Sequence, residues 1–223
     1  MQYFKHTAIW LLAVCLWVTL AATQQTQADP TDDFSFALGG GQTPSSYYLM
    51  PESKVAAVLR DRLDLYPRSE THKLARHILS LCRKYKFDPA FILSIIQVES
   101  GFHVKAHSPM GAMGLMQLMP ATAEVIATRD HIQYSGARAL FDPFTNLNLG
   151  VAYLAMLRDK YRGRSSSAYY VMAAYNMGPA RMDSLLLKKS FKPTQTKKYF
   201  ETIERGVPNM RFYYARSEAK DDV

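Results

Sequence analysis

The chain of 223 residues is poor in cysteine, since it contains only Cys15 and Cys82. Two cysteines exclude a small scaffold that depends on several disulfides. Cys15 lies in an amino-terminal segment that we expect to be removed, so no intramolecular disulfide is predicted. Cys82 is in helical phase with Leu74, Ile78 and Leu81, which predicts a place in a hydrophobic core.

Alternating runs of Val, Ile and Thr are also missing, so no β-sheet is predicted. Helical periodicity recurs instead, with Gly and Pro near the ends of the periodic segments. The sequence therefore predicts an all-α, mostly helical fold. The expected helices cover residues 52–65, 69–85 with Ser69 as N-cap, 89–99 with Asp88 as N-cap, 120–128, 145–161, 165–175, 181–188 and 196–205.

The amino terminus has the composition of a secretory signal peptide. Lys5 precedes an uncharged apolar run of 13 residues, Ala8 to Leu20, which is short for a membrane span. Ala22 and Ala28 are candidate cleavage positions, and an uncleaved anchor is the alternative. A signal peptide of this kind predicts that the protein is exported to the periplasm or cell envelope.

The remaining chain is divided by composition. Residues 29–50 contain three consecutive glycines and many Thr, Ser and Gln, as a flexible linker does. We predict an amino-terminal helical extension at 51–68, a catalytic domain at 69–210 and a polar tail at 211–223.

One acid stands out because it follows an apolar helical stripe. Ile92, Ile95, Ile96 and Glu99 project from the same face of the expected helix. Burial disfavours the ionised form, so this carboxyl group is suited to hold a proton near neutral pH, as a general acid must. The alternative is a buried glutamate that only satisfies a cap or an ion pair.

Three short motifs surround this acid in order. They are E-S-G-F at 99–102, S-P-M-G-A at 108–112 running into G-L-M-Q-L-M-P at 114–120, and A-Y-N-M-G-P at 174–179. Together they resemble the catalytic domain of the soluble-type (SLT-domain) peptidoglycan lytic transglycosylases, members of the lysozyme-like superfamily. The resemblance covers about residues 70–205 and implies a lysozyme-like domain with a sugar-binding groove.

The resemblance implies a reaction with one catalytic acid, Glu99. The acid protonates the β-1,4 bond between N-acetylmuramic acid and N-acetylglucosamine, and then, as a base, takes a proton from the muramic C6 hydroxyl. The product is a 1,6-anhydromuramoyl end. Glu124 and Asp130 are the nearest acids downstream, and Glu124 lies in a helix-like run where a solvated face is the simpler interpretation.

The resemblance also implies the residues that bind substrate. Ser108 corresponds to a serine near the reacting sugar, Gln117 and Met119 to groove residues, and Tyr175 to a tyrosine whose hydroxyl approaches the catalytic carboxyl group. Asn176 is expected to have a structural role. Met113 and Met116 are read as core residues.

One segment departs from the family pattern. Family members often carry an acid just before a T-R-x-Y-V segment, whereas this chain has Gln195 before T-K-K-Y-F at 196–200. A groove carboxylate from this region is therefore not carried over.

Two other functions stay open at this point. A goose-type lysozyme would hydrolyse the same bond on the same fold, but it needs a second acid, and none is evident. A catalytically silent wall-binding or scaffold protein would not need Glu99, Ser108, Gln117 and Tyr175 together.

Partners follow from charge and from the resemblance. The formal net charge of +8 suits an anionic partner such as the bacterial wall. No nucleic-acid-binding motif accompanies it. We expect a monomer that acts on peptidoglycan glycan strands, in general wall turnover or beside a secretion, conjugation or motility machine.

No cofactor or metal is predicted, because the histidines form no H-E-x-x-H or Cys/His pattern. His103 and His107 are four residues apart, but they flank a loop-like segment. The six histidines are His6, His72, His77, His103, His107 and His131. We expect full activity in a chelator. An enzyme that a chelator inactivates and zinc restores would contradict this expectation.

Overall fold

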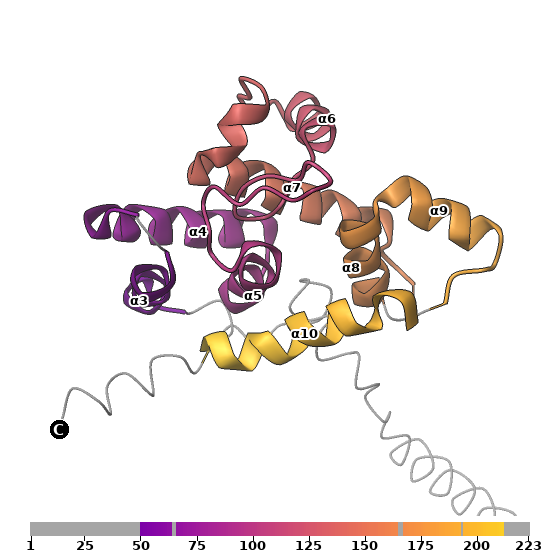
Figure 1. Ribbon diagram of the computed structural model, residues 1–223. Coiled ribbons are helices and arrows are strands. Elements are labelled where there is room, and N and C mark those ends of the chain that lie inside the picture. The colour runs from indigo at the N-terminus through magenta and orange to yellow at the C-terminus, as the bar shows by residue number, and fades with distance from the viewer. Residues whose placement is uncertain (1–49, 64–65, 165–166, 193, 212–223) are drawn as a thin grey trace, which may run out of the picture. The chain divides into compact units, whose positions relative to one another are not determined.

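The computed structural model describes residues 50–63, 66–164, 167–192 and 194–211, and every regular element in these ranges is helical, as predicted (Figure 1). The predicted signal peptide, all of the linker but its last residue, and all of the polar tail but its first residue lie outside the described residues. The α-helices are α3 (Glu52–Arg62), α4 (Thr71–Tyr85), α5 (Pro89–Ser100), α6 (Pro120–Asp130), α7 (Pro143–Lys160), α8 (Ser167–Met177), α9 (Pro179–Leu187) and α10 (Thr194–Arg211), with short 3-10 helices η1 (Arg68–Glu70) and η2 (Ala137–Phe141).

Helix α5 begins as the sequence predicts. The Asp88 carboxylate accepts a hydrogen bond of 2.7 Å from the Ala90 N–H, and Pro89 occupies the first turn, where a missing N–H costs nothing. Residues 89–96 are buried, including the predicted stripe of Ile92, Ile95 and Ile96. The stripe therefore holds the carboxyl end of α5 in a fixed position.

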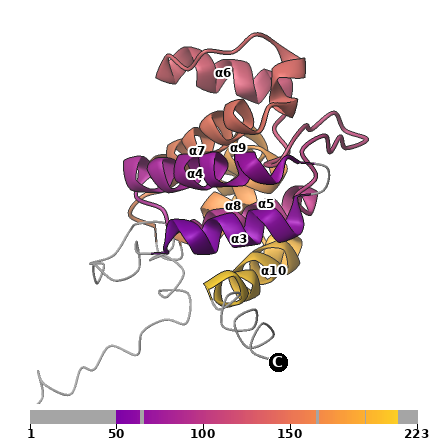
Figure 2. The same cartoon turned by 90° about the vertical axis from the view of Figure 1, so that its left-hand side faces the viewer.

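Helix α5 packs mainly against α10, which crosses it in Figure 1. Helix α3 packs on α4, and α4 packs on α7 (Figures 1 and 2). Helices α10 and α5 approach closely at Gly206, where an added Cβ would come within 3.1 Å of the Ser94 Cβ. Cys82 is buried in the core, as expected, and burial raises the pKa of its thiol.

The long loop between α5 and α6 is held by one buried side chain of α7. The Asn146 amide accepts from the Met116 N–H at 2.8 Å and donates to the Met113 carbonyl at 2.9 Å and the Leu140 carbonyl at 3.0 Å. The loop backbone lies so close that a Cβ at Gly114 would be 2.1 Å from the Leu140 oxygen. Buried backbone groups must find partners, and here Asn146 supplies them.

Several helix boundaries differ from the sequence prediction. Ser69 is not the N-cap of α4, because residues 68–70 form a 3-10 turn and the helix begins at Thr71. Helix α10 does not end near Arg205 but continues through Pro208 to Arg211. Proline removes one intrahelical hydrogen bond, which the packing of Ile203 and Val207 in the core outweighs. Within the described ranges, no helix combines the length and apolarity that a bilayer span requires.

Gly114→Ala should destabilise the protein more than Gly163→Ala. The two glycines have nearly the same positive φ, +77° and +79°, but only Gly114 has backbone and side-chain atoms in the path of a Cβ. Both substitutions carry left-handed strain of roughly 1–2 kcal/mol, so the excess measures the steric clash. Thermal denaturation of the two variants makes the comparison. Equal losses would show that the loop moves freely away from α7.

Candidate functional site

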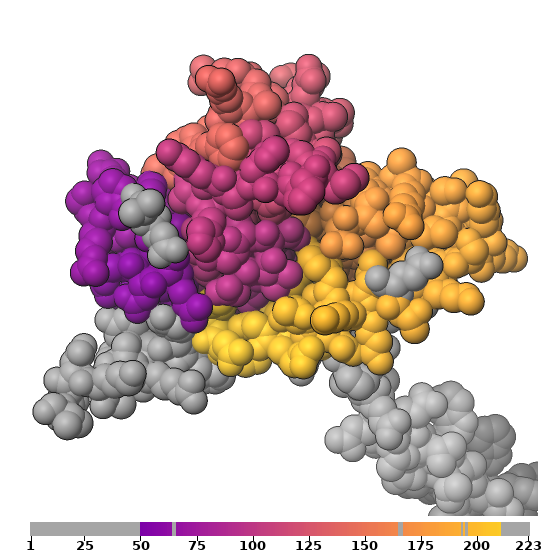
Figure 3. Space-filling view, in the orientation of Figure 1, coloured from indigo at the N-terminus to yellow at the C-terminus, as the bar shows by residue number. Residues whose placement is uncertain are grey.

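A cavity of about 450 Å³ lies beside the carboxyl end of α5. Every residue that the sequence predicted for the site lines this cavity. In Figure 3 the loop after α5 (magenta), α8 (orange) and α10 (yellow) meet on the face shown. We call this space the Glu99 cavity. Its lining consists of Glu99, Ser108, Met110, Ala112, Gln117, Leu118, Met119, Thr122, Tyr153, Tyr175, Asn176, Met177 and Gly178.

The carboxyl group of Glu99 is half-buried, and its ionisation is displaced accordingly. Burial raises the pKa of Glu99 from 4.5 to about 7, although a hydrogen bond from the Tyr199 hydroxyl opposes the rise. Burial penalises the charged form, whereas a donated hydrogen bond stabilises it. Near neutral pH the group therefore exists in both forms, so it can donate a proton and later accept one.

Tyr199 is the residue of the site that the sequence analysis missed. It lies on α10 and donates to Oε1 of Glu99, and its own pKa is raised well above the usual value by burial and by the charge of Glu99. The phenol thus stays protonated and remains a donor. Tyr199 lies in the segment 196–200, which follows Gln195, the residue in place of the acid of the family pattern; the side chain of Gln195 lies outside the described part. The tyrosine of that pattern was the available signal.

Tyr175 is placed differently from the prediction. Its hydroxyl donates to the Met116 carbonyl at 2.8 Å, not to Glu99, and its ring lies 5.2 Å from that of Tyr153. Burial, followed by the charge of Glu99, raises the pKa of Tyr175 well above its usual value. The residue lines the Glu99 cavity and also supports the loop that carries Gln117.

Ser108 faces the cavity from a tight turn. Its Oγ accepts from the Ala112 N–H at 3.0 Å, and its backbone N–H donates to the Ala112 carbonyl at 2.9 Å. Among the described residues, no acceptor takes the Ser108 hydroxyl proton, so the hydroxyl can donate to a ligand.

Gln117 is held by the loop itself. Its Nε2 donates to the Gly114 carbonyl at 2.9 Å and to the Ala106 carbonyl at 3.2 Å, and its backbone adopts φ +47°. Both amide hydrogens are thereby used, so Oε1 is left to accept from a ligand. A left-handed residue other than glycine costs free energy, which is common at binding sites.

The three methionines assigned from the sequence take the positions predicted for them. Met119 is 42% exposed at the mouth of the cavity, whereas Met113 and Met116 are buried core residues. Asn176 is exposed and lines the cavity, a place that fits contact with a ligand as well as the structural role expected for it.

The described ranges contain no cluster of three or more His, Cys, Asp or Glu that could hold a metal ion. The ring Nδ1 of His103 lies 2.9 Å from the Ser100 carbonyl oxygen, close to the start of the loop.

Comparisons with known proteins place the chain in a family. The transglycosylase SLT domain family matches residues 77–198, more than half of the chain, and the protein belongs to this family. It is similar to the lytic transglycosylase Slt of Pseudomonas aeruginosa, solved as an inactive glutamate-to-glutamine mutant, with 27% identity and a TM-score of 0.50 over 65% of this chain and 24% of that one. It is also similar to the 70 kDa soluble lytic transglycosylase of Escherichia coli, with 26% identity and a TM-score of 0.50 over 66% of this chain and 27% of that one. The chain thus spans about a quarter of the length of these enzymes.

Tyr199→Phe should shift the pH dependence of any reaction that needs protonated Glu99. The lost hydrogen bond stabilised the carboxylate, so the pKa of Glu99 should rise further above 7. The alkaline limb of the activity profile should move up by about one to two pH units, since a hydrogen bond to a charged group contributes ~1.5–3 kcal/mol and each pKa unit corresponds to ~1.4 kcal/mol.

Tyr175→Phe is the matched control, because it removes a hydroxyl from a second tyrosine whose pKa is raised by burial and by the charge of Glu99. It leaves the buried Met116 carbonyl without this donor, which should lower Tm and leave the alkaline limb in place. A shift of the limb in Tyr175→Phe alone would reverse the roles assigned to the two tyrosines.

Proposed function

We propose that this protein is a peptidoglycan lytic transglycosylase that cleaves the β-1,4 bond between N-acetylmuramic acid and N-acetylglucosamine. The observation that carries the proposal is a single carboxyl group, Glu99, in a cavity that raises its pKa to about 7. Family membership and the two lytic transglycosylase relatives support it.

The first step needs a proton on the leaving oxygen. Protonated Glu99 donates it, the glycosidic bond breaks, and positive charge develops at the anomeric carbon of the muramic residue. Glu99 is then a carboxylate, and the Tyr199 hydroxyl stabilises this form by its hydrogen bond.

The second step returns the proton to Glu99. The carboxylate takes it from the C6 hydroxyl of the muramic residue while the C6 oxygen bonds to the anomeric carbon. The product is a 1,6-anhydromuramoyl end, and no water is consumed. The attacking hydroxyl belongs to the same sugar, so proximity replaces a second nucleophile.

The polar atoms of the Glu99 cavity complement an N-acetylated sugar. The Ser108 hydroxyl can donate to an acetamido carbonyl, and the Gln117 Oε1 can accept from an N–H or a sugar hydroxyl. Met119 and Tyr153 offer apolar surface to the sugar ring. Export to the periplasm or cell envelope, as the amino-terminal sequence predicts, would bring the cavity to its substrate.

Hydrolysis in the manner of a goose-type lysozyme is the second candidate. It would need another acid to hold the attacking water, and Glu99 is the one acidic residue among the described side chains that line the cavity. Glu124, the nearest acid downstream, faces a different cavity. A scaffold without activity would have no use for a carboxyl group kept half-buried at a cost in stability.

The test is a digest of purified peptidoglycan by residues 29–223, followed by mass spectrometry. Products with 1,6-anhydromuramoyl ends, lighter by one water than reducing ends, are expected from the wild-type protein and not from Glu99→Gln. Reducing-end products would make the protein a hydrolase. Anhydro products from Glu99→Gln would remove Glu99 from its catalytic role.

Glu99→Gln should also raise Tm, and more so at pH 8 than at pH 4. Between pH 4.5 and about 7 the unfolded chain loses the Glu99 proton while the folded protein keeps it, so wild-type stability falls as pH rises through this range. Glutamine has no such penalty. Scanning calorimetry at the two pH values measures the difference, and an equal Tm shift at both would contradict a raised pKa.

A further inference from the structure

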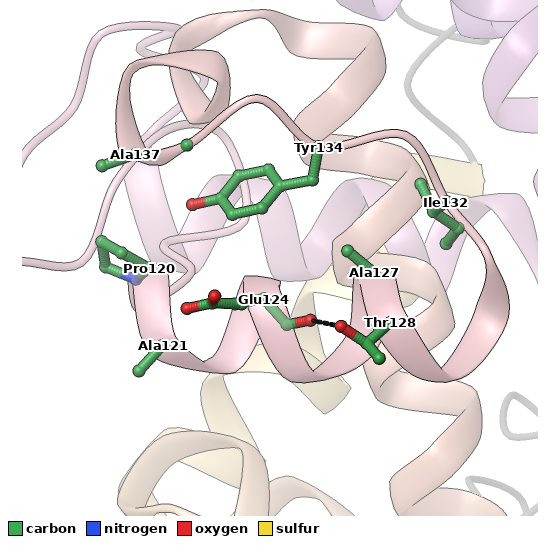
Figure 4. A pocket seen from close by; sticks show the side chains of 9 residues that line it. Pro120, Ala121, Glu124, Ala127, Thr128, Ile132, Tyr134 and Ala137 are labelled. Carbon is green, nitrogen blue, oxygen red and sulfur yellow. Dashed lines mark hydrogen bonds between the residues drawn. The ribbon is translucent and has the colours of Figure 1, made fainter.

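A second cavity, of about 550 Å³, lies between α6 and the segment that follows it (Figure 4). Pro120, Ala121 and Glu124 line it from the helix, and Tyr134 lines it from the opposite side. Figure 4 shows the Tyr134 ring lying across the cavity, with its hydroxyl and the Glu124 carboxylate both at the end near Pro120. We call this space the α6 cavity.

Both of these polar groups are without a protein partner. The Tyr134 hydroxyl is shielded from solvent and has no hydrogen-bond partner among the described residues. The Glu124 side chain is exposed, and its carboxylate forms no ion pair with any described Lys, Arg or His, while its backbone carbonyl accepts from the Thr128 hydroxyl at 2.9 Å. A shielded hydroxyl without a partner is uncommon in folded proteins and costs free energy, so a ligand that bonds to it is favoured.

The α6 cavity and the Glu99 cavity lie on opposite sides of the first turn of α6. Met119 and Thr122 line the Glu99 cavity, whereas Pro120, Ala121 and Glu124 line the α6 cavity. A helix with its side chains is about 10 Å across. An extended peptide advances roughly 3.3 Å per residue, so about three residues attached to a sugar in the first cavity could reach the second.

We propose that the α6 cavity binds a primary ammonium group on the peptide of a substrate whose glycan occupies the Glu99 cavity. This rests on the proposed function. An ammonium group donates three hydrogen bonds, so it can donate to the Glu124 carboxylate and to the Tyr134 phenol oxygen together. An anionic group would be repelled by the Glu124 carboxylate. An uncharged group would leave the charge of Glu124 without a partner of opposite sign.

The kinetic test compares peptidoglycan fragments whose peptides carry a free side-chain amine with the same fragments after N-acetylation of that amine. Glu124→Gln should raise KM for the free-amine fragments roughly two- to fivefold, the effect of a partly exposed ion pair, and leave kcat unchanged. The acetylated fragments should show no such change. Tyr134→Phe should act in the same direction.

Glu70→Gln is the matched control, since it removes the same charge from an exposed glutamate that is paired with Lys73 outside both cavities. Equal KM values for Glu124→Gln and Glu70→Gln on the free-amine fragments would overturn the proposal. So would an equal KM increase on the acetylated fragments.

A binding test does not depend on turnover. The probe is an acetylated tripeptide amide ending in lysine, titrated into the Glu99→Gln protein and followed by NMR shifts of residues in α6. Weaker binding of its Nε-acetyl form, together with loss of that difference in the Glu99→Gln, Glu124→Gln double variant, supports the α6 site even if no lytic activity is found. Equal shifts with both probes, or none, would overturn it.

Discussion

The hydrogen bond from Tyr199 to Glu99 joins residues 100 positions apart and sets the chemistry of the site. The apolar turns of α5 carry the Glu99 carboxyl group into a place where its charge is disfavoured. The phenol on α10 partly restores that charge. The balance leaves the pKa at about 7, where one group can serve as acid and then as base. The close approach of Gly206 to Ser94 keeps the two helices at the distance that this bond requires.

The loop between α5 and α6 supplies the other polar atoms of the site, and it has almost no regular structure of its own. Its shape depends on the buried amide of Asn146 and on close contact with α7, where a Cβ at Gly150 would lie 2.4 Å from the Met116 sulfur. Gln117 uses both amide hydrogens inside the loop. The atoms that face the cavity are therefore held before a ligand arrives, which reduces the free energy lost on ordering them.

Local signals predicted much of this arrangement. The Asp88 cap, the Pro89 start and the buried stripe of α5 depend on neighbouring residues, and all three are confirmed. Ser69 was wrong as a cap because residues 68–70 form a 3-10 turn before α4 begins at Thr71. The predicted end of α10 near Arg205 was wrong because core packing outweighed the effect of Pro208.

The sequence by itself determined the all-α class, the helix that carries Glu99 and the motifs that line its cavity, since each depends on periodicity, caps and residues close together in the chain. Only the tertiary structure decided which tyrosine reaches Glu99. Tyr175 sits in the stronger motif, yet its hydroxyl is used by the Met116 carbonyl, and Tyr199 reaches the acid from the last helix. The same holds for the contacts of Asn146 and for the placement of Glu124 and Tyr134 on one cavity. Such contacts depend on how helices pack against one another, and helix packing is set by the whole core rather than by any local segment.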